Sequence, residues 1–471
     1  MNIALIRPPK ITGAFEKILI QEPINLAYLA AFLNANKFKT IIWDFEVEHF
    51  SPDILARKIK EANISIIGIT SMTPTINNAH DLAKATKKIN NNIITIAGGA
   101  HVSAVPKQSL EEFPCFDYLV LREGEIALLK LCQNLRDKQP IDSISGIAFI
   151  KDEQAVINQP TEDIEDLDSL PFPDRSLLNH NLYKNMYAAG IDTAGKKPTV
   201  LFTSRGCSQD CTFCAVKKTS GPKARFRSAE NVIAELKQCK DMGYNHITFE
   251  DTNLTLNPDR FKQICFGLKE LKLTWDCQTK VSMVNKQLIS LMKDCGCLKI
   301  AYGVESGSPK ILKLMKKNIT IEQIKQAFKL THKAGIVACA FFILGSHPEE
   351  TAEDIALTEQ IIKEIKPDVF QLGIICPYPG TEIYNIMQEY GLIKDIDWNK
   401  FNFMHSVPPW GTKHLTAQQL VTFQKQIYTR YLFSWHFIGF FCKKMLNPKQ
   451  LPQLCKLSFY MLKYLLFEKR K

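Results

Sequence analysis

Two successive series of short apolar runs alternate with longer helical patterns, which limits this chain to largely parallel sheets covered by helices. The first series predicts strands at residues 3–6, 40–44, 64–69, 93–97 and 118–121. The second predicts strands at 199–203, 246–250, 274–281, 298–304, 337–344 and 369–375. Helices are expected between them, with Ser228 as one N-cap and Thr320 with Gln323 as a capping box. The first series therefore predicts a doubly wound, Rossmann-like domain.

A chain of 471 residues suggests two or three domains. We expect the Rossmann-like domain at residues 1–145 and a second α/β domain at residues 197–385. Between them, residues 146–196 contain an acidic stretch with prolines, TEDIEDLDSLPFPDRS, which predicts a linker. Residues 386–471 form a C-terminal region that is helical in pattern, aromatic and basic.

Three cysteines, Cys207, Cys211 and Cys214, directly follow the first apolar run of the second domain, in LFTSRGCSQDCTFCA. Their thiolates can converge on one inorganic centre if the loop wraps round it, and Arg205 is expected to lower their pKa. A [4Fe-4S] cluster held by three cysteines keeps one iron open for another ligand. The alternative is half of a zinc site, but a closed zinc site needs a fourth nitrogen or sulfur ligand. No second C-x-x-C or H-x3-H pattern follows.

The C-x3-C-x2-C spacing, with an aromatic residue directly before the last cysteine, resembles the signature of the radical S-adenosylmethionine (SAM) superfamily. The resemblance implies that the open iron binds SAM. It also implies that six β/α units form a partial (β/α)6 barrel with its chemistry at the carboxyl ends of the strands. The SAM contacts that it implies are Phe213, Glu250, Asp251, Glu305 and Gly345. Helix caps and surface charges are the alternative interpretation of single carboxylates.

A second resemblance covers most of the first 130 residues. The succession RPP, EPINLAYLAAFL, IIGITSMTPT, IAGGAHVS and DYLVLREGE is similar to the cobalamin-binding domain that precedes the radical SAM core in one large branch of the superfamily. The cobalamin contacts that it implies follow the strands, at Pro9, Thr70, Ser71, Gly98, Gly99, Glu123, Gly124 and Glu125. The alternative is a Rossmann-like domain that has lost its ligand or only docks partners.

The D-x-H-x-x-G motif, which supplies a histidine to cobalt in other cobalamin enzymes, is absent from this sequence. The resemblance therefore implies that this histidine does not hold the lower face of the cobalt. His49 and His101 are poor substitutes. His101 follows the glycine pair and could touch the ligand, but a loop histidine is more often solvated.

The tail from residue 417 to 471 is rich in aromatic residues, and from Phe437 onward it contains eight Lys or Arg and one acidic residue. Such a segment could lie in a membrane interface, but we expect it to cover the cobalamin-binding domain. No stretch reaches the roughly 18 apolar residues of a membrane span.

Fourteen cysteines, and a first segment MNIALIRPP that predicts a strand without a cleavage site, predict a cytoplasmic location, with membrane association as an option. The net charge of +11 is mostly diffuse lysine, and no nucleic-acid partner is expected. The expected partners are a small-molecule or lipid-like substrate and an electron donor such as flavodoxin or ferredoxin.

The resemblance implies a cobalamin-dependent radical SAM enzyme that methylates an unactivated carbon through a 5′-deoxyadenosyl radical and methylcobalamin. Cyclisation or rearrangement without methyl transfer is an alternative within the same branch. A transfer RNA methylthiotransferase would need three more N-terminal cysteines and a C-terminal β-barrel. A non-catalytic Fe-S/cobalamin-binding sensor is the alternative from another class. The substrate and any general acid or base stay unassigned.

Overall fold

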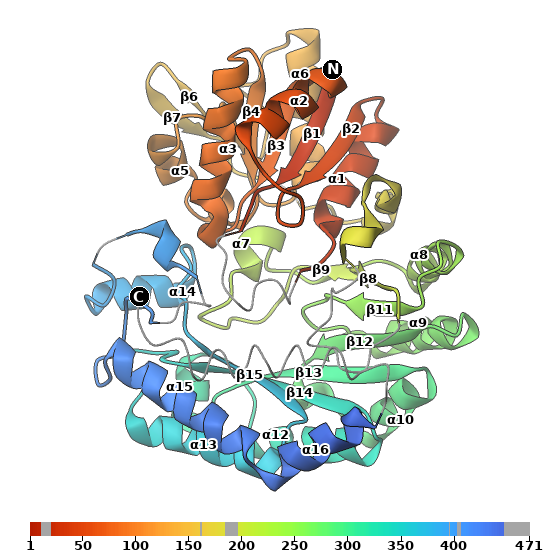
Figure 1. Cartoon of the computed structure of the whole chain (residues 1–471), viewed down its shortest axis with the longest axis vertical. Coiled ribbons are helices and arrows are strands. Elements are labelled where there is room, and N and C mark those ends of the chain that lie inside the picture. The colour runs from red at the N-terminus through yellow and green to blue at the C-terminus, as the bar shows by residue number, and fades with distance from the viewer. Residues whose placement is uncertain (11–19, 161–162, 184–195, 395, 403–406, 447–471) are drawn as a thin grey trace.

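The computed structural model describes residues 1–10, 20–160, 163–183, 196–394, 396–402 and 407–446. In Figure 1 the N-terminal α/β unit lies at the top and a second, curved α/β unit lies below it, with β9 and α7 between them. The two units are joined by ion pairs at the loops after the strands and by an apolar cluster that contains side chains of both units.

The N-terminal sheet has seven strands in the order β2-β1-β3-β4-β5-β6-β7. Strands β1 to β5 are parallel and span Asn2–Arg7, Lys39–Asp44, Ile64–Thr70, Ile94–Gly98 and Tyr118–Val120. The five predicted strands are therefore confirmed. Their order is doubly wound, and the direction of winding changes between β1 and β3, where such sheets bind ligands.

Two strands extend this sheet beyond the prediction. β6 (Ile147–Lys151) and β7 (Gln154–Ile157) form an antiparallel hairpin, and β6 pairs with β5. The prediction that the linker begins at residue 146 was wrong here, because apolar side chains of this stretch, such as Ile147 and Phe149, are buried in the N-terminal core. The sheet is therefore mixed, with an antiparallel edge.

Helices cover both faces of the N-terminal sheet. Side chains of α1 (Ile24–Ala35) and α6 (Gly124–Asp137) pack on one face. Those of α2 (Pro52–Ala62), α3 (Ile76–Ile89) and α5 (Pro106–Glu112) pack on the other, and the short α4 (Ala100–Ala104) follows β4. Burial on both faces explains why the strands contain almost continuous Ile and Ala instead of an alternating pattern.

The second unit is a six-stranded, all-parallel sheet in the order β8-β11-β12-β13-β14-β15. These strands span Pro198–Leu201, His246–Phe249, Thr274–Thr279, Cys297–Glu305, Val337–Leu344 and Val369–Ile374. The six predicted strands are confirmed, and their order along the chain is that of an open, partial barrel. A two-stranded ribbon of β9 (Ser204–Arg205) and β10 (Arg225–Phe226) lies next to β8 in sequence.

Six helices of the barrel lie on its outer surface (Figure 1). They are α8 (Ala229–Asp241), α9 (Pro258–Glu270), α10 (Lys286–Asp294), α11 (Pro309–Leu314), α12 (Ile321–Lys333) and α13 (Ala352–Ile365). The short α7 (Val216–Ser220) lies between the two units, and α14 (Glu382–Glu389) packs into the apolar cluster of the N-terminal sheet. The two predicted caps are confirmed: Ser228 accepts a hydrogen bond from the backbone at the start of α8, and Thr320 and Gln323 form a capping box on α12. Short 3-10 turns occur at Thr73–Thr75, Leu167–Ser169, Arg175–Leu177, His180–Tyr183, Val281–Met283 and Trp398–Lys400.

The described part of the C-terminal tail covers the barrel and not the N-terminal unit. α15 (Ala417–Leu432) contributes Leu420, Val421 and Ile427 to the barrel core, and Gln424 Nε2 donates a hydrogen bond to the carbonyl oxygen of Leu372 on edge strand β15. The expectation that the tail covers the cobalamin-binding domain was wrong for these residues, because the open barrel edge needs a cover. The predicted tail aromatics beyond residue 446 lie outside the described residues. α16 (Trp435–Met445) follows, and among the described helices none has the length and apolar character of a membrane span.

Candidate active site

The three cysteines lie on the loop between β9 and α7, at the carboxyl end of the first barrel strand. The Cys214 backbone N–H donates to the Cys211 carbonyl oxygen at 3.2 Å, which tightens the end of the loop. The Thr212 N–H donates to the carbonyl oxygen of Met315 at 3.1 Å, so the middle of the loop is tied to the far side of the barrel mouth. With Cys207 at its start, the loop is held where a barrel of this kind performs its chemistry.

All three thiols are free and partly exposed. Burial raises the pKa of Cys211 and Cys214, and electrostatic repulsion from the neighbouring cysteines raises both pKa values further. Three mutually coupled thiols on one loop fit a cluster that binds three thiolates and neutralises their charge. In the described ranges no three or more His, Cys, Asp or Glu side chains, these cysteines included, are spaced to hold a single metal ion.

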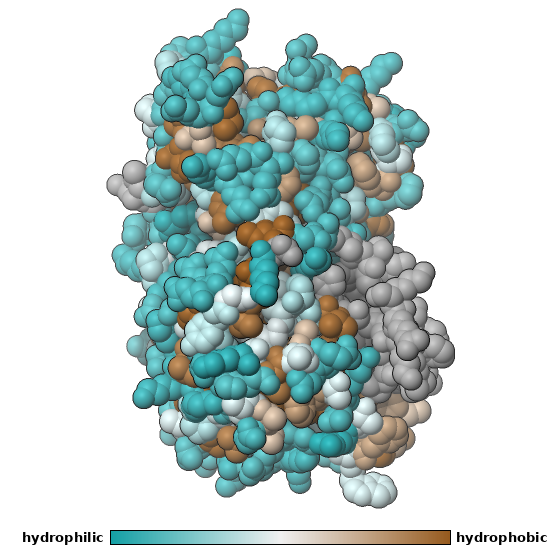
Figure 2. Space-filling model, turned by 90° about the vertical axis from the view of Figure 1, so that its left-hand side faces the viewer, coloured by the Kyte–Doolittle hydropathy of each residue, from teal (hydrophilic) through white to brown (hydrophobic). Residues whose placement is uncertain are grey.

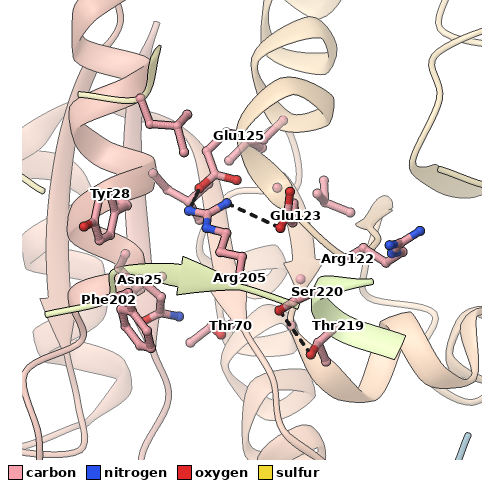
Figure 3. Close-up of a pocket in the computed structure, with 18 of the residues that line it drawn as sticks. Asn25, Tyr28, Thr70, Arg122, Glu123, Glu125, Phe202, Arg205, Thr219 and Ser220 are labelled. Carbon is pink, nitrogen blue, oxygen red and sulfur yellow. Dashed lines mark hydrogen bonds and ion pairs between the residues drawn. The ribbon is translucent and has the colours of Figure 1, made fainter. Parts of the chain in front are cut away.

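The cation that faces these thiols is Lys317, and it was missed in the sequence. Its charge opposes the rise in the pKa of Cys211 and Cys214. Arg205 was expected to have this role, but its guanidinium turns away to the N-terminal unit. There Nη2 lies 2.5 Å from a carboxylate oxygen of Glu125, and Nη1 lies 3.8 Å from Glu123 (Figure 3). No local sequence pattern indicates this role of Lys317, because the tertiary fold brings the turn after α11 next to the cluster loop.

Lys317 also connects two residues predicted to contact SAM. Its Nζ lies 2.6 Å from Oε1 of Glu305, at the end of β13, and 5.7 Å from the ring centroid of Phe213. Glu305 has a φ of +67°, unusual for a residue with a side chain, and Gly303 beside it has no room for a Cβ, which would lie 2.7 Å from Lys317 Nζ. The backbone is therefore shaped to hold the Glu305 carboxylate and the Lys317 ammonium against the cluster loop.

Glu250 and Asp251 follow β11, but their surroundings differ. Glu250 lines a cavity and accepts a hydrogen bond from Gln21 Nε2 at 2.7 Å, and burial raises its pKa to about 6. Asp251 is buried, and it accepts hydrogen bonds from the Thr203 N–H and hydroxyl and from the Ser204 hydroxyl. The structure therefore gives Asp251 the role of holding the chain that leads into the cluster loop, in place of the predicted contact with SAM.

Gly345 was predicted to contact SAM, but the structure places it against the C-terminal helix. Its φ is +66°, and a Cβ there would lie 2.8 Å from Cδ1 of Leu420 in α15. The close approach of α15 to the end of β14 therefore accounts for a glycine at this position.

A cavity of about 400 Å³ lies between the carboxyl ends of the two sheets (Figure 3). The residues predicted to bind cobalamin that line it are Thr70, Gly98, Gly99, Glu123, Gly124 and Glu125. The barrel contributes Phe202, Arg205, Gly206 and Glu250, among others, to the opposite wall. The cavity therefore extends from the predicted cobalamin region to Gly206, next to Cys207, while the three cysteines themselves do not line it.

Pro9 and Ser71 do not line this cavity. The Pro9 carbonyl oxygen accepts a hydrogen bond from Asn78 Nδ2 at 2.7 Å, and the buried Ser71 hydroxyl donates to the Gly98 carbonyl oxygen at 2.9 Å. Both residues therefore brace the ends of β1 and β3 and do not face the predicted ligand.

The two carboxylates predicted for cobalamin are engaged in ion pairs between the two units. Glu123 accepts hydrogen bonds from Arg225 at 2.6 and 2.9 Å, and Glu125 accepts one from Arg205 at 2.5 Å. Both arginines come from the β9-β10 ribbon that leads to the cluster loop. Glu123 and Glu125 thus fix the cluster loop relative to the N-terminal sheet. The sequence did not indicate these ion pairs, because the partners are far apart in the chain.

The N-terminal wall of the cavity includes Gly68, in the middle of β3. A Cβ there would lie 2.8 Å from Cδ2 of Leu5, so a larger residue would displace that side chain. A glycine inside an apolar strand can mark a close approach, so this residue could have been found in the sequence. Leu5, Ile96 and Val120 give the same wall an apolar lining.

His101 neither faces the ligand cavity nor contacts solvent. It is fully buried, its ring centroid lies 4.6 Å from that of Trp398, and Nδ1 lies 3.3 Å from the Thr73 hydroxyl. Burial lowers its pKa to about 3, so it is uncharged at neutral pH. Both earlier interpretations of His101, ligand contact and solvated loop residue, were wrong because the region around Trp398 covers it; His49 is exposed.

Two family models match the chain. The model of the radical SAM superfamily matches residues 201–361, and the model of the B12 binding domain matches residues 19–131. The first range contains the cluster loop, Glu250 and Glu305. The second contains N-terminal strands that line the cavity. Members of such families use a [4Fe-4S] cluster, SAM and cobalamin.

Relatives of similar length support the same assignment. The chain is 32% identical to an uncharacterized methyltransferase of Pyrococcus horikoshii, over 91% of this chain and 92% of the relative. It is 29% identical to the anaerobic magnesium-protoporphyrin IX monomethyl ester cyclase of Rubrivivax gelatinosus, over 86% of this chain and 73% of that enzyme.

Solved structures share the fold. The radical SAM methyltransferase TsrM of Kitasatospora setae, with cobalamin and a [4Fe-4S] cluster bound, has a TM-score of 0.69 at 16% identity, covering 84% of this chain and 76% of its own. The cobalamin-dependent SAM radical enzyme OxsB has a TM-score of 0.74 at 18% identity, covering 98% of this chain and 71% of its own. The chain belongs to the family of radical SAM enzymes with an N-terminal cobalamin-binding domain, and its cofactors are a [4Fe-4S] cluster, SAM and cobalamin.

Proposed function

We propose that this enzyme transfers a methyl group to an unactivated carbon of a small-molecule substrate. The observation that supports the proposal most is the single cavity of about 400 Å³ that Thr70 and Gly98 line from one side and Glu250 and Gly206 from the other. Methyl transfer needs the methyl donor and the radical source to reach the same substrate carbon, and this cavity extends from the predicted cobalamin contacts to Gly206, next to the cluster cysteine Cys207. The relative from Pyrococcus horikoshii, which this chain covers over 92% of its length, is named an uncharacterized methyltransferase.

The chain's own residues have distinct tasks in this proposal. Cys207, Cys211 and Cys214 hold the cluster and leave one iron for SAM. Glu305 and Lys317 form a paired, largely buried acid and base at the cluster loop, which can hold polar groups of SAM. When bound, the three cofactors supply an electron, a carbon-centred radical and a methyl group. The protein excludes water by closing the chamber between two sheets.

Cyclisation without methyl transfer is the second candidate. One relative, 29% identical over 73% of its length, is named a cyclase, so the family fold alone does not distinguish the two reactions. The sensor alternative is not retained, because the family is one of enzymes. A one-electron donor such as flavodoxin or ferredoxin and a cytoplasmic location remain predictions, as does a lipid-like substrate.

The test uses SAM with an isotopically labelled methyl group. The reduced, cobalamin-loaded enzyme is incubated anaerobically with pools of candidate amino acids, tetrapyrroles and lipids, and products are analysed by mass spectrometry. A product carrying the labelled methyl, together with 5′-deoxyadenosine, is expected. A new product that forms with 5′-deoxyadenosine but without the label would refute methyl transfer and favour cyclisation.

Replacing Glu305 by glutamine is expected to weaken SAM binding by about tenfold, which corresponds to about 1.4 kcal/mol. The substitution removes the charge that Lys317 faces at 2.6 Å and leaves this buried ammonium without its ion-pair partner. Equilibrium binding of SAM to the reconstituted protein measures the effect. Glu322→Gln, on the exposed first turn of α12, is the matched control. Unchanged SAM affinity in Glu305→Gln would remove this residue from the predicted SAM contacts.

The affinity for SAM is expected to fall as the pH is lowered through about 6. Burial raises the pKa of Glu250 to about 6, so this carboxylate is ionised above that pH and protonated below it. An ionised carboxylate can accept hydrogen bonds from an amine on both of its oxygens, whereas a protonated one cannot. The affinity for SAM should therefore be higher above the pKa of Glu250 than below it. SAM binding measured from pH 5 to 8 in the parent should show this step, and Glu250→Gln should flatten it. The same step in both proteins would assign the titration to another group.

A further inference from the structure

We propose that α16 and the adjacent end of α13 form a docking surface for an anionic lipid membrane, at the end of the barrel opposite the active site. The surface consists of the exposed apolar residues Phe433, Trp435 and Leu446 and of a basic cavity beside them. The proposal is independent of the reaction that the enzyme catalyses.

The apolar part of this surface is unusually exposed. The relative exposure of Phe433 is 76%, that of Trp435 is 89% and that of Leu446 is 85%, while none of the residues of α16 is buried. Ile438 and Met445 on the same helix are exposed too. Figure 1 places α16 along the lower end of the molecule, and Figure 2 shows hydrophobic residues at that end among others scattered over a mostly hydrophilic side. Trp with aliphatic side chains on a short surface helix is typical of insertion into a lipid interface.

A basic cavity lies beside Trp435. Its volume is about 250 Å³, and the charged residues that line it are Lys363, Lys366, Arg430 and Glu359. Lys363 and Arg430 share the Glu359 carboxylate, at 2.6 and 2.7 Å. Lys366 has no ion-pair partner among the described residues. Three cations with one carboxylate leave a net positive site that matches the phosphate of a lipid headgroup in size and charge.

The sequence around this surface favours an anionic partner over a second copy of the chain. From Ala417 to Leu446 it contains four Lys or Arg and no Asp or Glu. Two such faces would repel each other, whereas an anionic membrane attracts them. The exposed Leu446 and Met445 also favour a lipid over a nucleic acid, because aliphatic side chains bury in acyl chains but do not provide the flat stacking surface that bases need.

The surface is remote from the cofactors. The Tyr431 hydroxyl at the end of α15 donates to the carbonyl oxygen of Pro367, which precedes β15, so α16 lies at the amino end of the barrel strands. The cluster loop and the ligand cavity lie at the carboxyl end. A membrane contact here would anchor the enzyme with its active site facing away from the bilayer, and SAM cleavage should not depend on it.

The test is co-sedimentation of the full-length protein with phosphatidylcholine vesicles that contain or lack phosphatidylglycerol. We expect at least about tenfold stronger binding to the anionic vesicles, and loss of that preference at high salt. Trp435→Ser and Lys366→Gln should each weaken binding by about tenfold and leave 5′-deoxyadenosine formation unchanged. Phe266→Ser is the matched control, because Phe266 is an exposed aromatic of α9 with Lys262 over its ring.

Several outcomes would overturn the proposal. One is that the parent protein does not sediment with anionic vesicles, or binds neutral vesicles equally well. Another is tighter binding to a polyuridylate probe than to the vesicles, which would indicate a nucleic-acid surface. A third is a dimer in solution that Trp435→Ser converts to a monomer. The comparison of anionic with neutral vesicles uses only the parent protein. It therefore tests the proposal even if a variant fails to fold.

Discussion

Serine at position 207, 211 or 214 is expected to reduce the formation of 5′-deoxyadenosine from SAM by at least about a thousandfold. A serine hydroxyl stays protonated where a cysteine gives the thiolate that binds iron, so each substitution removes one of three ligands that act as a unit. Because the loop is held by backbone hydrogen bonds, such as Thr212 N–H to the Met315 carbonyl oxygen, the variants should keep the fold of the parent. Iron and sulfide content after anaerobic reconstitution, and 5′-deoxyadenosine by chromatography, measure the effect.

The matched control is Cys442→Ser, because Cys442 is an exposed thiol on α16, at the far end of the barrel. It should reconstitute iron and cleave SAM as the parent does. If Cys211→Ser retained the parent rate of SAM cleavage, the three-cysteine cluster would be the wrong description of this loop.

Glu235→Gln is expected to lower the free energy of unfolding by about 3–5 kcal/mol, because it leaves two arginines buried without their counter-charge. Glu235, on α8, is fully buried, and its carboxylate lies 2.7 Å from Arg175 Nη2 and 2.5 Å from Arg227 Nη1. The Tyr28 hydroxyl of α1 donates to the same carboxylate at 3.2 Å. This carboxylate therefore joins the barrel, the connecting segment and the N-terminal unit.

The measurement is urea-induced unfolding of the protein without cofactors, followed by circular dichroism and by tryptophan fluorescence to detect separate unfolding of the two units. Glu230→Gln is the control on the same helix, since Glu230 is exposed on the first turn of α8, and it should change stability by less than about 0.5 kcal/mol. A loss below about 1 kcal/mol in Glu235→Gln would mean that the two arginines are solvated in the folded protein.

The sequence was sufficient for the strands, the three cysteines and the carboxylates at the strand ends. Each of these is encoded locally: the apolar runs of β1 to β5 are buried on both faces, and the cluster ligands lie within eight residues of one another. Glu250 and Glu305 were assigned from the resemblance to the radical SAM superfamily, and the structure places both at the carboxyl ends of parallel strands, where such a barrel has its chemistry.

The roles of single polar residues depended on partners that are distant in the chain. Asp251 was predicted to contact SAM, and in the structure it accepts a hydrogen bond from Thr203. The carboxylates of Glu123 and Glu125 form ion pairs with Arg225 and Arg205. A lone carboxylate in a sequence carries no information about which cation will meet it, because ion pairs form between side chains that the tertiary fold brings together.

The sequence by itself determined the strands of the two parallel sheets and the three cysteines predicted to bind the cluster, because these follow from hydrophobic period and short-range spacing. Only the tertiary structure decided that Lys317 faces the thiols, that Gly345 makes room for Leu420 and that the first part of the C-terminal tail covers β15. The physical reason is that side chains select their packing partners by shape and charge in three dimensions. The residues concerned are far apart in the chain, and the sequence between them does not indicate that they will be in contact.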